Sequence, residues 1–163
     1  MARHPSGFTL MEVVVALAIV AILATMALPS MTDSIVRKQI VDAVPLADIV
    51  KAAVAQSWAG SAALPANNAS AGLPPPGKIV NNYVSSVALE SGAIQITFGN
   101  SAHKLIAGRI LTLRPAVVAD APIVPVAWVC AHAAVPAGMT VLGEDRTDVP
   151  VGMLPYNCRA PGK

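Results

Sequence analysis

Residues 7–38 read GFTLMEVVVALAIVAILATMALPSMTDSIVRK, a long segment of mainly apolar residues. Between Glu12 and Asp33 it carries no charged side chain. A helix needs about 20 mainly apolar residues to cross the hydrocarbon core of a bilayer. We therefore predict one transmembrane helix over residues 8–32, with Glu12 as the single acid inside it.

An ionised side chain inside a bilayer is costly, about 2.5–3.5 kcal/mol on insertion scales, so Glu12 is interpreted as a functional group that needs a partner. A simpler interpretation is that Glu12, near the start of the helix, reaches the lipid headgroups and complements the helix dipole. A secretory signal peptide is the alternative for the whole segment. Its apolar core would be shorter and would end at a small-residue cleavage site.

Composition limits the rest of the chain. The 163 residues are 55% hydrophobic and only 12% charged, which is typical of one domain linked to a membrane. The net charge of +2 is small and the cations are scattered, so binding to nucleic acid is not supported by charge. The two cysteines, Cys130 and Cys158, have no metal-type spacing and favour a disulfide on the oxidising side of a membrane.

Beyond the membrane, residues 33–60 are predicted to continue as an amphipathic helix that ends at Gly60. Pro29 and Pro45 are predicted to kink this long helix, because proline removes a backbone donor. The apolar positions that recur at helical spacing are Val36, Ile40, Ala43, Ala47, Val50 and Val54. One face of this segment must therefore be covered by another element.

Residues 61–163 are predicted to form a globular head. A loop rich in proline, glycine and asparagine occupies residues 61–78, and a sheet occupies residues 79–130. The strands are expected at residues 83–89, 93–98, 110–114 (ended by Pro115) and 126–130. The fold class is α+β, with a roughly four-stranded antiparallel sheet packed on the helix.

The N-terminus resembles a known family. Residues 1–7, followed by Phe8-Thr9-Leu10-Met11-Glu12-Val13, resemble the basic leader and mature start of type IV prepilins. Segments 82–87, 111–115 and 128–130 also resemble the body of proteobacterial type IVa major pilins. The resemblance implies that residues 1–7 are a leader, which a prepilin peptidase cuts off between Gly7 and Phe8 before methylating the Phe8 amine.

The resemblance also gives Glu12 a partner. A cut after Gly7 frees an α-amine at Phe8, which is a cation, and staggered helices can bring it against Glu12 of the next copy. The implied role of Glu12 is to set register during assembly. The implied partners are further copies of this chain, the prepilin peptidase, the pilus assembly machinery of the inner membrane and, before assembly, membrane lipid.

The implied function is that of a structural subunit. It would lie in the inner membrane as a single-pass protein with its head in the periplasm, and later in an extracellular pilus used for adhesion, motility or DNA uptake. A minor or competence pilin and a type II secretion pseudopilin are the alternatives, although the cysteine pair disfavours the pseudopilin. The resemblance also implies a disulfide that bounds residues 130–158 and attaches this region to the sheet.

No catalytic residue, cofactor or metal site is predicted. The three histidines follow no ligand spacing, and a metal held by Cys130, His132 and Cys158 lacks an obvious fourth ligand. Calcium binding by Glu144, Asp145 and Asp148 competes with the simpler interpretation of a solvated turn. A membrane-anchored enzyme would need a reactive group of residues in the head, and none is visible in the sequence.

Overall fold

The computed structural model describes residues 7–162, without the side chains of residues 26–30. Six residues of the expected leader, 1–6, thus lie outside the described residues. The chain divides into two compact units, Met1–Ile35 and Val36–Lys163. After the non-helical residues 7–9, helix α1 (Leu10–Ala43) forms the rest of the described part of the first unit and begins the second.

In the first unit, α1 is helical from Leu10 onward and includes the position of Pro29. The side chain of Pro29 lies outside the described residues, so the kink expected there stays a prediction. The second expected kink, at Pro45, falls in the short 3-10 helix η1 (Val44–Ala47). The α-helical hydrogen bonding changes there because Pro45 has no N–H to donate. The kink itself stays a prediction.

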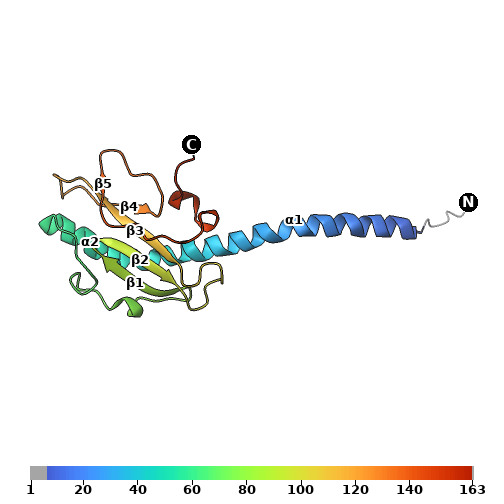
Figure 1. The fold of residues 1–163 in the computed structure, drawn as a ribbon, viewed down its shortest axis with the longest axis horizontal. Coiled ribbons are helices and arrows are strands. Elements are labelled where there is room, and N and C mark those ends of the chain that lie inside the picture. Colours follow the sequence, from blue (N-terminus) through green and yellow to red (C-terminus); the bar gives the residue numbers. More distant parts are fainter. Residues whose placement is uncertain (1–6, 163) are drawn as a thin grey trace, which may run out of the picture. The chain divides into compact units, whose positions relative to one another are not determined.

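The second unit is an α+β fold, as expected (Figure 1). After η1, helix α2 (Asp48–Ser61) continues the helical segment, and one side of it packs against the sheet. The six apolar positions predicted from helical spacing, Val36 to Val54, are all fully buried. Trp58, one turn further on, is nearly so. The periodic apolar face is therefore the helical half of the core.

The sheet supplies the other half of this core. Its four main strands are antiparallel neighbours in chain order, and a short fifth strand, β5, pairs with β3. Side chains that alternate along the strands point toward the helix, as with Ile94 and Ile96 of β2. The strands are β1 (Val84–Glu90), β2 (Ala93–Phe98), β3 (Ile110–Val117), β4 (Ala127–Cys130) and β5 (Thr140–Val141).

Two expected ends of elements were wrong. The helix does not end at Gly60, because α2 continues to Ser61 and the left-handed residue that caps it is Ala62, at φ +52°. Strand β3 does not end before Pro115, which pairs with Trp128 of β4. The carbonyl of Pro115 accepts from the Leu142 N–H, on the side away from β4. The missing proline donor therefore leaves the β3–β4 ladder intact.

The β1–β2 hairpin turns at Ser91 and Gly92, which both have positive φ, +49° and +87°. Two such residues are typical of the type I′ turn that matches the twist of paired strands. The turn lies against the loop after α2, and a Cβ added at Gly92 would come within 2.5 Å of Leu64 Cδ1. Glycine is therefore required here for both conformation and space.

We expect Gly92→Ala to lower the free energy of unfolding by about 2 kcal/mol, because the substitution strains a positive φ and displaces Leu64. Gly77→Ala is the matched control, since a Cβ at Gly77 meets no atom within 4 Å. Chemical unfolding of the full chain in detergent, followed by circular dichroism, measures both variants. Equal stability of the two would contradict this role of Gly92.

Candidate functional site

The described chain starts α1 with a hydrogen-bonded cap. The Glu12 N–H donates to Thr9 Oγ1 at 3.3 Å and to the Thr9 carbonyl at 3.1 Å. The Val13 N–H also donates to the Thr9 carbonyl, at 3.3 Å. Thr9 is therefore the N-cap residue and Glu12 occupies the third helical position, which is the spacing of a capping box. Sequence reasoning missed the cap, although a Thr followed three residues later by Glu is its known signal.

This cap places the two expected assembly residues at defined points. Glu12 lies in the first turn, where a carboxylate complements the positive end of the helix dipole. Phe8 precedes the cap, and its side chain is 82% exposed. The Phe8 nitrogen and the Glu12 side chain thus both lie at the exposed start of the helix. Their pairing between copies stays a prediction.

From Leu10 to Thr25, the side chains of α1 are exposed and mostly apolar. Those large enough to matter for packing are Leu10, Met11, Val13, Val14, Val15, Leu17, Ile19, Val20, Ile22 and Leu23. An apolar surface of this extent on all sides of a helix needs lipid or other protein to cover it. The first unit is therefore built to associate with something outside itself.

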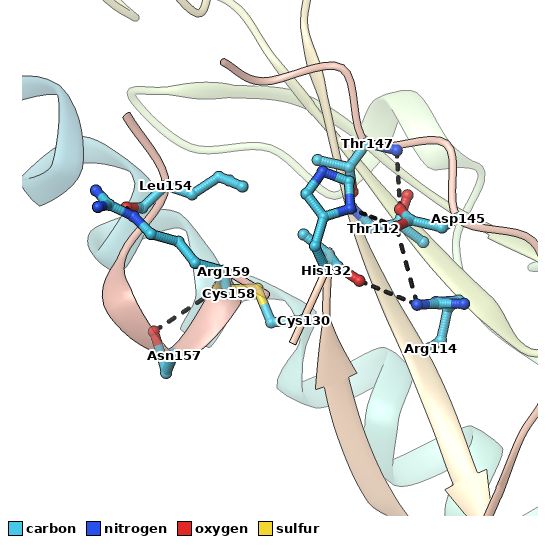
Figure 2. Close-up of a disulfide and its surroundings, with 11 residues drawn as sticks. Thr112, Arg114, Cys130, His132, Asp145, Thr147, Leu154, Asn157, Cys158 and Arg159 are labelled. Atoms are coloured by element: carbon cyan, nitrogen blue, oxygen red, sulfur yellow. Dashed lines mark hydrogen bonds and ion pairs between the residues drawn. A yellow bond between two sulfur atoms is a disulfide. The ribbon is translucent and has the colours of Figure 1, made fainter. Parts of the chain in front are cut away.

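At the other end of the chain, Cys130 and Cys158 form a disulfide, with an S–S distance of 2.05 Å (Figure 2). The predicted bridge is thus confirmed. It joins the last residue of β4 to the short 3-10 helix η4 (Tyr156–Cys158). The His132 N–H donates to the Cys158 carbonyl at 3.2 Å, so backbone contact accompanies the covalent link. The C-terminal region is therefore attached directly to the sheet.

A model of the pilin family, which is described as a bacterial filament protein, matches residues 36–159. The chain belongs to the pilin family. A second model, the prokaryotic N-terminal methylation motif, matches residues 2–28. The two matches together cover most of the exposed helix, the head and the disulfide-bounded region of this pilin.

Curated relatives give the same assignment. A type IV major pilin protein of Neisseria gonorrhoeae is 35% identical over 159 residues, which are 94% of this chain and 86% of the relative. A fimbrial protein of Neisseria meningitidis is 38% identical over 108 residues, 66% of this chain and 64% of the relative. Fimbrial protein EcpC of Eikenella corrodens is 38% identical over 111 residues, 66% of this chain and 72% of the relative.

The predicted resemblance to type IV pilins is thus confirmed, and the pilin is a structural protein rather than an enzyme. The expected transmembrane segment, residues 8–32, includes residues 26–30, whose side chains lie outside the described residues. Within the part of the chain that the structure describes, no helix is both long and apolar enough to cross a membrane.

The disulfide-bounded region of the pilin contains a segment that covers the sheet, residues 144–148, which we call the strap. Two polar side chains of the sheet, Gln95 and Thr112, are buried beneath it. They are opposite each other on β2 and β3, and the Thr112 hydroxyl donates to Gln95 Oε1 at 2.6 Å. Sequence alternation places them on the face away from the helix, which would be solvated without the strap.

The strap is held to this face through both backbone and side-chain groups. The Arg146 N–H donates to Thr112 Oγ1 and the Thr112 N–H donates to Thr147 Oγ1, both at 3.0 Å. Gln95 Nε2 donates to the Glu144 carbonyl at 3.4 Å. The buried polar pair is therefore satisfied by the strap, and buried polar groups without partners would cost about 1–3 kcal/mol each.

Asp145 is the acid of the strap that turns inward (Figure 2). One of its oxygens accepts from the Thr147 N–H at 3.0 Å, and the other lies 3.2 Å from His132 Nδ1 and 3.8 Å from Arg114 Nη2. Burial raises the pKa of the Asp145 carboxyl, but the hydrogen bonds from Thr147 and the nearby Arg114 and His132 outweigh it and lower this pKa overall.

Further contacts of this region involve the acids that the sequence offered either for calcium or for a solvated turn. Asp148 accepts from the Ile110 N–H at 2.5 Å, and its carboxylate lies 3.7 Å from Arg109. Asp145 is paired as above. In the described residues, no three histidine, cysteine, aspartate or glutamate side chains are grouped so that they could hold a metal ion. Two of the three acids that the sequence offered for calcium, Asp145 and Asp148, thus lie against cations and a backbone N–H at the sheet.

We expect Asp145→Asn to destabilise the head by about 1 kcal/mol at pH 7, because it removes charge-assisted contacts to Arg114 and His132. The pKa of Asp145 is lowered in the folded state, so its contribution is present above the unfolded pKa, about 3.9, and is lost as the pH falls through the folded value. The difference between wild type and variant should therefore vanish at low pH.

Unfolding curves at pH 7 and at successively lower pH values measure this effect, with Asp120→Asn, a change at an exposed loop acid, as the control. A stability difference that persists unchanged in acid would show that Asp145 acts by packing and not by charge.

Proposed function

We propose that this pilin is made as a prepilin with residues 1–7 as its leader, cut after Gly7 by a prepilin peptidase and methylated on the Phe8 amine. Support comes from the match of residues 2–28 to the N-terminal methylation motif. Before assembly the apolar helix lies in the inner membrane, with the head in the periplasm, where a disulfide can form and persist. Assembly machinery of that membrane then transfers it into an extracellular pilus.

The single observation that carries this proposal is the apolar helix of the first unit. Its side chains from Leu10 to Thr25 are exposed on all sides, and association with lipid, followed by association with equivalent helices of other copies, covers them. A homopolymer with these helices at its centre and the heads at its surface is the arrangement we propose. Similarity to major pilins favours the role of main subunit, and the fibre serves adhesion, motility or DNA uptake.

Glu12 sets register between copies by pairing with the free Phe8 amine of a neighbour. We expect Glu12→Gln to be inserted and processed normally but to reduce filament yield at least roughly tenfold, because it removes the charge. Glutamine is accepted at the third position of a capping box, so the helix start is retained. Filaments sheared from cells and quantified by immunoblot give the yield.

Thr9→Ala is the matched control for this experiment. It weakens the cap by about 1 kcal/mol but keeps the charge of Glu12, and it should leave filament yield largely intact. A normal filament yield from Glu12→Gln would contradict the register role, whatever the yield from Thr9→Ala. The side chain at position 12 would then act only in the helix cap.

Processing is tested at Gly7, where a Cβ would meet no atom within 4 Å. Gly7→Val therefore leaves the described fold unstrained and changes only what a peptidase meets. We expect the leader to stay attached, so that the intact mass of the membrane-extracted protein includes residues 1–7. An intact mass equal to that of a chain starting at Phe8 would show that this variant is still cut. It would reject the proposal that cleavage depends on glycine at position 7.

The share of this chain in purified filaments separates a main subunit from a minor one. Quantitative mass spectrometry of sheared fibres should find it as the dominant protein. A trace amount would assign it instead to the minor or competence pilins.

A further inference from the structure

Two arginines from distant parts of the chain meet at one backbone carbonyl of the head. Arg37, the second residue of the second unit, donates from Nε and Nη2 to the Gly152 carbonyl, at 3.3 and 3.1 Å. Arg159 donates from Nη2 to the same carbonyl at 2.9 Å, and from Nε to the Leu154 carbonyl at 2.8 Å. The C-terminal segment is therefore held against α1 beside Arg37, and it brings a second guanidinium group to this place.

Exposed side chains with apolar surface lie beside these two arginines. The guanidinium group of Arg159 lies over the ring of Tyr156, with 4.9 Å between Arg159 Cζ and the ring centroid, and Tyr156 is itself 85% exposed. Val151, which precedes the residue with the shared carbonyl, is more than half exposed. We call the surface formed by Arg37, Val151, Tyr156 and Arg159 the Arg37 patch.

The two stretches of sequence that contribute to the Arg37 patch carry an excess of positive charge. Residues 149–163 contain no aspartate or glutamate and two cations, Arg159 and Lys163. Residues 33–42 of α1 contain two acids and two cations, Arg37 and the exposed Lys38. These two stretches together have a net charge of +2, which equals the net charge of the whole chain. The patch therefore lies where the positive charge of the pilin is concentrated.

The place of Arg37 along α1 corresponds to the headgroup level of a bilayer, with the helix inserted as proposed above. The apolar run ends at residue 32, and five further residues of α-helix rise about 7.5 Å. A bilayer about 40–45 Å thick has a hydrocarbon core of about 30 Å, which leaves roughly 5–8 Å of headgroups on each side. Arg37 then lies among headgroups, and the C-terminal segment that it binds brings Tyr156 and Arg159 close to them.

The side chains of the patch suit this layer chemically. Arginine binds phosphate through two N–H groups at once, and cations close to an anionic membrane surface are attracted to it. Tyrosine is enriched at membrane interfaces, because its ring is apolar and its hydroxyl is polar. Exposed apolar surface next to cations is also the combination that interfacial membrane-binding segments use. Charge, composition and place along the chain thus all favour one partner, an anionic lipid surface.

We propose that the Arg37 patch binds the phosphate headgroups of anionic phospholipids while the pilin lies in the membrane. This inference rests on the membrane location given under the proposed function. The patch holds the head on the bilayer surface in one orientation about α1 before assembly. A subunit that enters a filament exchanges this lipid contact for contacts with other copies.

The test uses the full chain in nanodiscs of mixed phosphatidylcholine and phosphatidylglycerol, with one copy in each disc. A trace of lipid carries a spin label near the top of its acyl chain, and the labelled lipid is either phosphatidylglycerol or phosphatidylcholine. NMR then measures the paramagnetic relaxation of the Tyr156 and Arg159 amides. We expect labelled phosphatidylglycerol to give rates at least roughly threefold higher than labelled phosphatidylcholine, because the two arginines enrich anionic lipid beside them. Equal rates from the two labels would overturn the proposal.

Variants of Arg159 separate charge from structure. Arg159→Gln should bring the ratio of the two rates close to one, whereas Arg159→Lys, which keeps the charge, should retain it. Arg146→Gln is the matched control, because it removes the same charge from an exposed arginine of the strap that pairs with Glu90 at 2.6 Å. It should leave the ratio unchanged. A ratio in Arg159→Gln equal to that of wild type would overturn the proposal.

If Arg159→Gln does not fold, Tyr156→Asp replaces it. The Tyr156 side chain is largely exposed, so this change keeps the bonds of Arg159 to the two carbonyls and adds an acid that repels anionic headgroups. The ratio should again fall to about one. An unchanged ratio in folded Tyr156→Asp would overturn the proposal equally.

A further sample separates this inference from the proposed membrane location. A spin label at the end of the acyl chain of either lipid should broaden the amide signals of α1 between Leu10 and Thr25. If those signals broaden while the two rates at Tyr156 and Arg159 are equal, only the lipid-binding patch is rejected. If they do not broaden, the membrane location is rejected, and the patch with it.

Discussion

The head is organised around one continuous apolar stripe on the helical segment. It begins at Val36, is interrupted only in hydrogen-bonding pattern at η1, and ends at Trp58. The stripe must be removed from water, and the inward side chains of the antiparallel strands remove it. At about 25 cal/mol per Å² of apolar surface, this burial is the largest favourable term available to a domain of this size. The loop, the strap and the disulfide are arranged around this contact.

Polar contacts then cover the parts of the sheet that the helix does not cover. The strap covers the second face of the sheet by pairing its backbone with Thr112 and Gln95, and the disulfide holds the chain beyond it to β4. Asn68, in the loop after α2, closes the β1 edge in a similar way, through hydrogen bonds of its carboxamide to Val87 and Leu89. Both devices satisfy buried hydrogen-bonding groups, so they add specificity where the apolar core alone would allow several arrangements.

Sequence reasoning succeeded where the signal is local. Helical spacing from Val36 to Val54 and the alternation around Gln95 depend only on neighbouring residues, and both predicted their elements. The burial of Gln95 and of Asn68 could not be predicted, because each depends on a partner far along the chain. The expectation that Pro115 ends its strand was wrong, because it considered only the proline itself. Pairing with Trp128 on a distant strand keeps Pro115 within β3. The cap at Thr9 was visible in the sequence but was interpreted only as part of a family motif.

The cap has a consequence for the proposed cleavage after Gly7. The hydrogen bonds that define the first turn of α1 involve Thr9 and the residues after it. Hydrolysis of the bond between Gly7 and Phe8 would therefore free a positively charged amino group at Phe8 without any refolding of the first helical turn. Under the proposed processing, the conversion of uncut chain to cut chain would then proceed at a speed set by the peptidase and not by the folding of its substrate.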